Sequence, residues 1–137
     1  MPIRARTIRT DRQHARTRLR IALAYLETAK LTLSEQGRDE FLNVCAGLAV
    51  LAGIAASDSI CSSRLGMVNR GDDHRGAAEL LASATPDGRT LASTLNRLLD
   101  VKDEAHYGVA LVSASKTRSA VRWAERLTER AQEEIDR

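Results

Sequence analysis

The sequence contains few of the residues that build strands and tight turns. Among its 137 residues are 8 Gly and 2 Pro, and aromatic residues make up 3% of the chain. Strands are rich in aromatic and β-branched residues, whereas Ala, Leu and Arg, which dominate here, favour helices. The composition therefore predicts packed helices, and the length suits a single domain with one core.

The chain also lacks a long apolar run and a cysteine framework. The longest apolar run, from about Val44 to Ala56, is too short to span a membrane, and no apolar stretch follows the Arg-rich start as in a secretion signal. Cys45 and Cys61 fall in one predicted helix, about 24 Å apart, so they cannot form a disulfide with each other. We therefore expect a cytoplasmic protein with no membrane association.

The positive charge is concentrated at one end of the chain. The formal net charge is +3, but residues 1–20 hold seven Arg against Asp11 alone, and residues 21–137 carry a net −3. We expect residues 1–10 to form a flexible basic arm, which either binds RNA phosphates or only solubilises the terminus. The candidate nucleic-acid-binding residues are Arg4, Arg6, Arg9, Arg12, Arg16 and Arg20.

Hydrophobic periodicity predicts five helices. In the first, apolar residues recur at alternating spacings of four and three, which is typical of one buried stripe: Ala15, Leu19, Ala22, Leu26, Ala29 and Leu33. The predicted helices cover about residues 11–34, 39–65, 73–84, 90–106 and 113–135, with a turn over residues 85–88. The fold expected over residues 11–137 is an all-α, up-and-down helical bundle.

Two charged residues occupy positions where the helical period calls for a core residue. Asp58 lies four residues after Ile54, and Lys102 lies four residues after Leu98. Because burying an unpaired charge is costly, we expect Asp58 and Lys102 to face each other in or beside the core. They form either a structural ion pair that fixes the register of two helices or a polar pocket that holds a ligand.

Histidines near these charges are candidates for chemistry. His106 lies one turn after Lys102, and with Tyr107 the three could bind a phosphate or supply an acid–base pair. The alternative is that Tyr107 packs its ring while His106 faces solvent. His74 begins the third predicted helix, where a neutral imidazole can form a cap or a hydrogen bond. No metal-ligand spacing is present, so we expect neither a metal nor a cofactor.

The last predicted helix carries basic and acidic residues at alternating positions. The basic row is Arg118, Arg122, Arg126 and Arg130, and the acidic residues between them are Glu125, Glu129 and Glu133. Since these spacings bring opposite charges together on a helix, we expect a salt-bridged face in contact with solvent.

These polar clusters resemble segments of the HEPN superfamily, and the match is closest to small actinobacterial HEPN-like proteins. The segments are Ala56-Ser57-Asp58-x-Ile60-Cys61, Gly71-x-Asp73-His74 and Lys102-x-x-Ala105-x-Tyr107, and the resemblance covers about Ile21 to Ala131. It implies a bundle of four to five helices that dimerises and is often encoded beside a small nucleotidyltransferase. It also implies that Asp58, His74, Lys102 and Tyr107 form a polar ligand-binding site.

Many HEPN proteins are metal-independent ribonucleases of toxin–antitoxin or phage-defence systems, with the motif Arg, four to six residues, His. This chain lacks that motif. Three residues separate Arg70 from His74 and Lys102 from His106, and eight separate Arg97 from His106. Lys102 with its downstream Ala-x-Tyr instead matches a non-catalytic branch of the family.

The resemblance thus leads us to expect a non-enzymatic component of such a system. It would be a cytoplasmic homodimer that binds or regulates RNA or a partner protein, such as a nucleotidyltransferase or a toxin. Two alternatives stay open. One is a variant metal-independent ribonuclease that uses Lys102 and His106, and the other is a purely structural dimerisation module.

Overall fold

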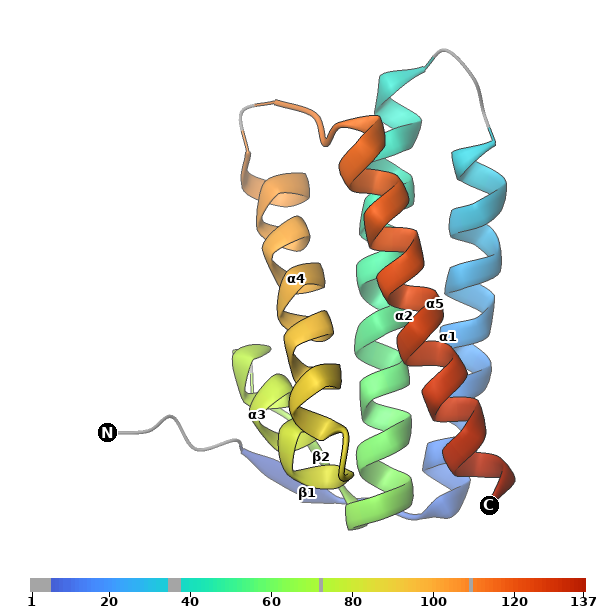
Figure 1. Cartoon of the computed structure of the whole chain (residues 1–137), viewed down its shortest axis with the longest axis vertical. Coiled ribbons are helices and arrows are strands. Elements are labelled where there is room, and N and C mark those ends of the chain that lie inside the picture. Colours follow the sequence, from blue (N-terminus) through green and yellow to red (C-terminus); the bar gives the residue numbers. More distant parts are fainter. Residues whose placement is uncertain (1–5, 35–37, 72, 109) are drawn as a thin grey trace.

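The computed structural model describes residues 6–34, 38–71, 73–108 and 110–137. This part of the chain forms an all-α bundle, as the sequence predicts, in which a short two-stranded sheet accompanies five helices (Figure 1). The elements in chain order are β1 (Thr7–Arg9), α1 (Arg12–Leu33), α2 (Asp39–Leu65), β2 (Met67–Asn69), α3 (Arg75–Ala84), α4 (Gly88–Tyr107) and α5 (Ala114–Asp136).

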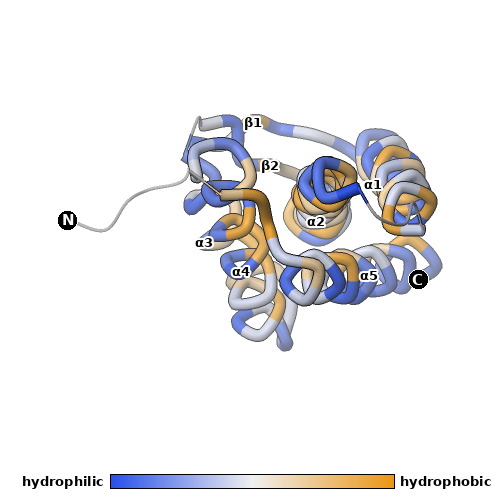
Figure 2. Tube along the Cα trace, turned by 90° about the horizontal axis from the view of Figure 1, so that it is seen from above, coloured by the Kyte–Doolittle hydropathy of each residue, from blue (hydrophilic) through white to orange (hydrophobic). Residues whose placement is uncertain are grey.

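Helix α2 is the centre of the bundle, and every other helix contacts it. Figure 2 shows α1, α3, α4 and α5 arranged around α2. Small side chains let the neighbouring helices approach closely. The buried small residues of α2 include Ala46, Ala49, Ala52, Gly53, Ala55 and Ala56.

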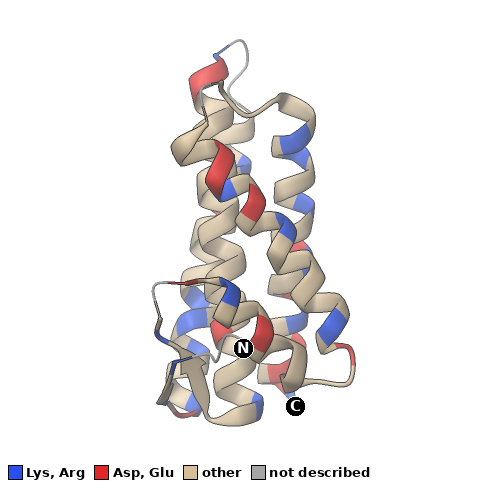
Figure 3. Cartoon of the chain, turned by 90° about the vertical axis from the view of Figure 1, so that its left-hand side faces the viewer, with Lys and Arg blue, Asp and Glu red and all other residues tan. Residues whose placement is uncertain are grey.

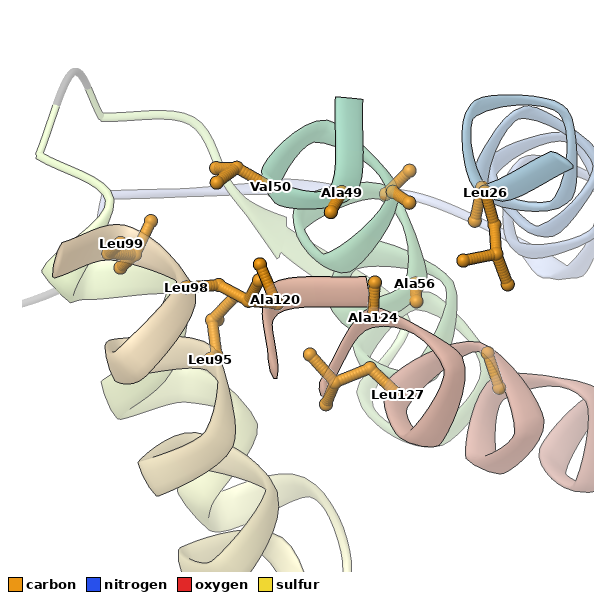
Figure 4. Packing of buried hydrophobic residues seen from close by; sticks show 14 of the residues in the cluster. Leu26, Ala49, Val50, Ala56, Leu95, Leu98, Leu99, Ala120, Ala124 and Leu127 are labelled. Atoms are coloured by element: carbon orange, nitrogen blue, oxygen red, sulfur yellow. The ribbon is translucent and has the colours of Figure 1, made fainter. Parts of the chain in front are cut away.

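The other helices supply most of the large side chains of the core, and α2 adds Ile60 and Val50. The predicted stripe of α1 is buried from Ala15 to Ala29, with Leu33 partly buried, and the predicted seam of α5, Ala120, Ala124, Leu127 and Ala131, is fully buried. Leu95 and Leu98 of α4 reach toward α2 and α5, as Figure 4 shows. Both helical periodicities are therefore confirmed.

Capping interactions fix three of the helix ends near their predicted positions. The Asp11 carboxylate accepts a hydrogen bond of 2.8 Å from the His14 amide at the start of α1. The Ser113 hydroxyl accepts one of 3.1 Å from Lys116 at the start of α5. Gly66 ends α2 with a φ of 66°, a left-handed conformation that glycine adopts without steric cost.

Helix α4 begins two residues earlier than the sequence predicts. The Gly88 amide donates to the Thr85 carbonyl oxygen at 3.0 Å, which closes the predicted turn. The Thr85 hydroxyl donates to Asp87 at 2.7 Å within the same turn. The helix therefore starts at Gly88, directly after Asp87, and not after a cap at Thr90.

Residues 7–9 differ from the predicted flexible arm of residues 1–10. They form β1, which pairs antiparallel with β2 and places Ile8 opposite the buried Val68. The Arg70 amide extends this ladder by donating to the Arg6 carbonyl oxygen at 2.7 Å. A strand of three residues is too short to show the alternation that identifies strands, and residues 1–5 lie outside the described part.

The prediction that no apolar stretch is long enough to span a membrane does not hold for α2. By length and composition it could cross a membrane, although the sequence suggested that no apolar run was long enough. In the bundle, 67% of its most apolar window is buried among the other helices. The core therefore accounts for its apolar character, and the cytoplasmic location stays a prediction.

The two cysteines are buried and do not form a disulfide with each other, as predicted. The Cys45 thiol donates to the Ala29 carbonyl oxygen at 3.1 Å. Burial raises the pKa of Cys45 to about 11 and that of Cys61 to about 12, and the Asp58 charge adds to the second shift. Both thiols therefore stay protonated at neutral pH and behave as core residues.

Two glycines of α2 provide a test of this packing. A methyl group on Gly53 would collide with the Leu98 side chain and touch Leu127, whereas one on Gly47 would meet no atom of the described chain within 4 Å. We predict that Gly53→Ala lowers the free energy of unfolding by about 1–3 kcal/mol. Gly47→Ala should raise it by about 0.5–1 kcal/mol, because alanine favours the helix. Urea unfolding measures both, and equal effects would contradict the packing.

Candidate functional site

A polar cavity of about 200 Å³ lies between the start of α3 and the second half of α4. Its lining residues are Asp73, His74, Arg75, Leu99, Lys102 and Asp103. The structure thus brings together two residues of the predicted polar site, His74 and Lys102, from segments far apart in the sequence.

Hydrogen bonds and an ion pair hold the two walls of this cavity. The Asp73 carboxylate accepts from the Arg75 amide at 2.9 Å at the first turn of α3. The Arg75 guanidinium then crosses to α4, where it donates to Asp100 at 2.7 Å and to the Asn96 side chain at 2.8 Å. Arg75 and Asp73 are therefore occupied in joining and capping helices.

Lys102 is the cavity's cation that remains available for a ligand. Its side chain is half-buried, and it has no hydrogen-bond or ion-pair partner among the residues that the structure describes. Asp103, which is exposed, lines the same cavity. A compact ammonium group binds an anionic oxygen, and a carboxylate accepts from a hydroxyl or amino group. The cavity therefore suits a small group that carries both an anion and a hydrogen-bond donor.

Among the residues that the structure describes, no group of three or more His, Cys, Asp or Glu side chains is placed to hold a metal ion.

Asp58 does not face Lys102, so the predicted pair between them is wrong. Its carboxylate forms an ion pair with the Arg18 guanidinium of α1 at 3.1 Å, and both side chains are largely buried. Burial raises the pKa of Asp58, while Arg18 and the nearby His14 oppose that shift. The stripe of α2 that carries Asp58 is turned toward α1, whereas α4 packs elsewhere on the same helix.

Tyr107 and His106 lie at the exposed end of α4 and do not line the cavity. The Tyr107 side chain is 79% exposed, and its ring meets the His106 ring edge-on at 6.1 Å between centroids. The alternative in which His106 faces solvent agrees with this placement, although Tyr107 does not pack its ring into the core. The three candidate catalytic residues, Lys102, His106 and Tyr107, are thus not gathered in one cavity.

The predicted RNA-binding arginines have different environments. Arg12 is a structural residue, because its guanidinium donates to Ser63 at 3.3 Å and to the carbonyl oxygens of Ile135 and Arg137 at 3.1 Å. Arg6, Arg9, Arg16 and Arg20 are exposed, and none forms an ion pair within the described part of the chain. Arg4 lies outside the described residues.

The most buried charged residue of the described chain, Glu134, is not among the residues predicted from the sequence. Glu134 is 1% exposed and forms ion pairs with Arg64 of α2 at 3.3 Å and with Arg130 at 3.1 Å. It follows Leu127 by seven residues and Ala131 by three, so it lies on the apolar seam of α5. The spacing rule that singled out Asp58 would also have found Glu134.

The predicted salt-bridged face of α5 forms only at Arg130. That guanidinium pairs with Glu133 at 3.0 Å and reaches across to Asp87, before α4, at 2.8 Å. Glu125 instead pairs with Lys30 of α1 at 3.4 Å. In the described chain, the other three arginines of the row, Arg118, Arg122 and Arg126, have no carboxylate partner.

Comparisons with known proteins add no relative: no family model matches the chain, and no curated protein matches it.

The bond from Arg130 to Asp87 predicts a pH dependence of stability. Arg130 holds the pKa of Asp87 well below its ordinary value of 3.8. The unfolded chain therefore binds the proton first on acidification, and the stabilisation is present above pH 4 and lost as the pH falls below it. We predict that Asp87→Asn costs about 1 kcal/mol at pH 7 and less at pH 3.

Glu129→Gln is the matched control, because Glu129 is exposed and has no ion-pair partner among the described residues. Urea unfolding at pH 7 and pH 3 gives the difference from the wild type for each variant. A cost of Asp87→Asn that stays constant or grows toward pH 3 would contradict the ion pair.

Proposed function

We propose that the protein is a HEPN-like binding module that recognises a phosphate ester through the cavity between α3 and α4. The observation that carries this proposal is Lys102, a half-buried cation in a polar cavity with no partner among the described residues. An ammonium group binds phosphate as a point charge, and Asp103 can accept from a neighbouring hydroxyl, such as that of ribose. The cavity holds the phosphate and part of a sugar, not a whole nucleotide.

The placement of His106 argues against the variant ribonuclease that would use Lys102 and His106. General acid–base catalysis needs a proton-transfer group within hydrogen-bond reach of the reacting atoms. His106 lies at the exposed end of α4 and is not among the residues that line the cavity with Lys102. This arrangement favours the regulatory component of a toxin–antitoxin or phage-defence system over the variant ribonuclease.

The proposal includes a homodimer formed through the open side of α2. In Figure 2 no helix of the described chain covers the side of α2 opposite α5. Val44 and Leu51, seven residues apart on α2, are 51% and 43% exposed, and Gly47 lies between them with open space beside it. A two-fold axis would place the same apolar strip of a second copy against it.

A phosphate titration tests the ligand. We predict that inorganic phosphate and adenosine monophosphate shift the amide signals of residues 73–76 and 99–103 in a ¹⁵N-labelled sample. Lys102→Ala should weaken binding about tenfold, the effect of losing one charge-assisted hydrogen bond. Lys116→Ala is the matched control, since Lys116 is an exposed lysine engaged with Glu104. Unshifted signals, or equal losses in both variants, would refute the proposed site and leave the dimerisation module.

Light scattering tests the dimer. The wild type should have twice the mass of one chain, and Leu51→Glu should give a folded monomer, because a buried interface does not accept an unpaired carboxylate. Leu31→Glu is the control, since Leu31 is a 66% exposed residue of α1. A monomeric wild type, or a dimer that survives Leu51→Glu, would count against the open side of α2 as the interface.

A further inference from the structure

Five arginines on α4 and α5 have no carboxylate partner among the residues that the structure describes. All five are exposed. They are Arg89 and Arg97 of α4 and Arg118, Arg122 and Arg126 of α5. We name this set the α4–α5 arginine face. Figure 3 shows Lys and Arg positions recurring along the helices on this side of the bundle, with Asp and Glu positions among them.

The ion pairs of neighbouring residues leave this face positively charged. Lys30 neutralises Glu125, and Lys116 neutralises Glu104. Arg64, Arg130 and Arg137 together balance the charges of Asp87, Glu133 and Glu134. Glu129 lines the same surface hollow of about 470 Å³ as Arg122 and Arg126, and it is the acid of this hollow without an ion pair in the described chain. Five arginines therefore face one unpaired carboxylate.

The arrangement of these cations is regular. Arg118, Arg122 and Arg126 recur every four residues on α5, which spaces them by about 6 Å along the helix axis. Arg97 joins them from α4, where its guanidinium lies 5.8 Å from the centre of the Trp123 ring of α5. The three arginines of α5 therefore form a row, and Arg97 of α4 adds a positive charge beside it.

We infer that the α4–α5 arginine face binds the backbone of single-stranded nucleic acid. Guanidinium groups bind phosphate oxygens in a bidentate way, and an evenly spaced row follows a repeating chain of phosphates. An acidic protein surface would not require such a repeat. This inference goes beyond the proposed function, because the two surfaces lie on different sides of α4. Arg75 of α3 pairs with α4 beside the cavity, whereas Arg97 of α4 lies over the Trp123 ring of α5.

Fluorescence anisotropy with a 5′-labelled RNA of 20 nucleotides and mixed sequence tests the inference in the full chain. The variant is Arg122→Gln with Arg126→Gln. The matched control is Arg38→Gln with Arg70→Gln, which removes the same charge from exposed arginines that lie outside α4 and α5 and are not among the candidate nucleic-acid-binding residues. Both double variants should keep the wild-type thermal midpoint, because neither pair is buried.

The expected result is salt-dependent binding whose slope in log K against log salt becomes shallower by about 1.4 in the α5 variant. The control variant should keep the wild-type slope. Three results would overturn the inference. The first is no RNA binding by the wild type, and the second is an equal change of slope in the control variant. The third is an α5 variant that loses binding to polyglutamate but keeps its binding to RNA. Inorganic phosphate binding at Lys102 is measured separately, so failure here leaves the cavity's test intact.

Discussion

Close approach of the helices around α2 is the constraint on which the rest of the structure depends. A run of Ala, Gly and Ser on the buried sides of α2 lets four other helices pack against one 27-residue helix. Leu98 of α4 and Leu127 of α5 meet over Gly53, where a side chain would have no room. Most of the large apolar side chains of the core therefore come from the outer helices, and α2 adds Ile60 and Val50 among its small residues.

Charged residues at the lower end of the bundle fix how these helices end. Glu134 joins α5 to Arg64 of α2, and Arg130 joins α5 to Asp87 before α4. Glu134 is buried, so breaking its ion pairs would leave an unpaired charge inside the bundle, and these contacts favour this arrangement of α2 and α5. Acids that are paired here are not available to pair with the arginines of α4 and α5.

The sequence predicts the fold well because helical periodicity is a local signal. The stripe of α1 and the seam of α5 are visible without any knowledge of neighbours. The partner of Asp58 is not, because periodicity places a residue on a face of its own helix and does not say which helix covers that face. The strand at Thr7–Arg9 could not be predicted for another reason, since its hydrogen bonds depend on a segment about sixty residues away.

Only part of the candidate site could be predicted from the sequence, because periodicity does not say which helices lie side by side. His74 and Lys102 do share a cavity, whereas Asp58 and Tyr107 lie elsewhere. Whether Arg122 and Arg126 are paired could not be inferred from spacing, because Glu125 finds its partner on α1 and Glu133 finds its partner at Arg130. Competition between partners on different helices is settled only by the fold.

We propose above all that this protein binds a phosphate-bearing ligand and does not cleave it. Incubation of 5′-end-labelled RNA with a molar excess of the protein, followed by a denaturing gel, tests this claim most directly. The account predicts that the RNA stays full-length over hours, with wild type and His106→Ala alike. RNA cleavage by the wild type that disappears with His106→Ala or Lys102→Ala would contradict it.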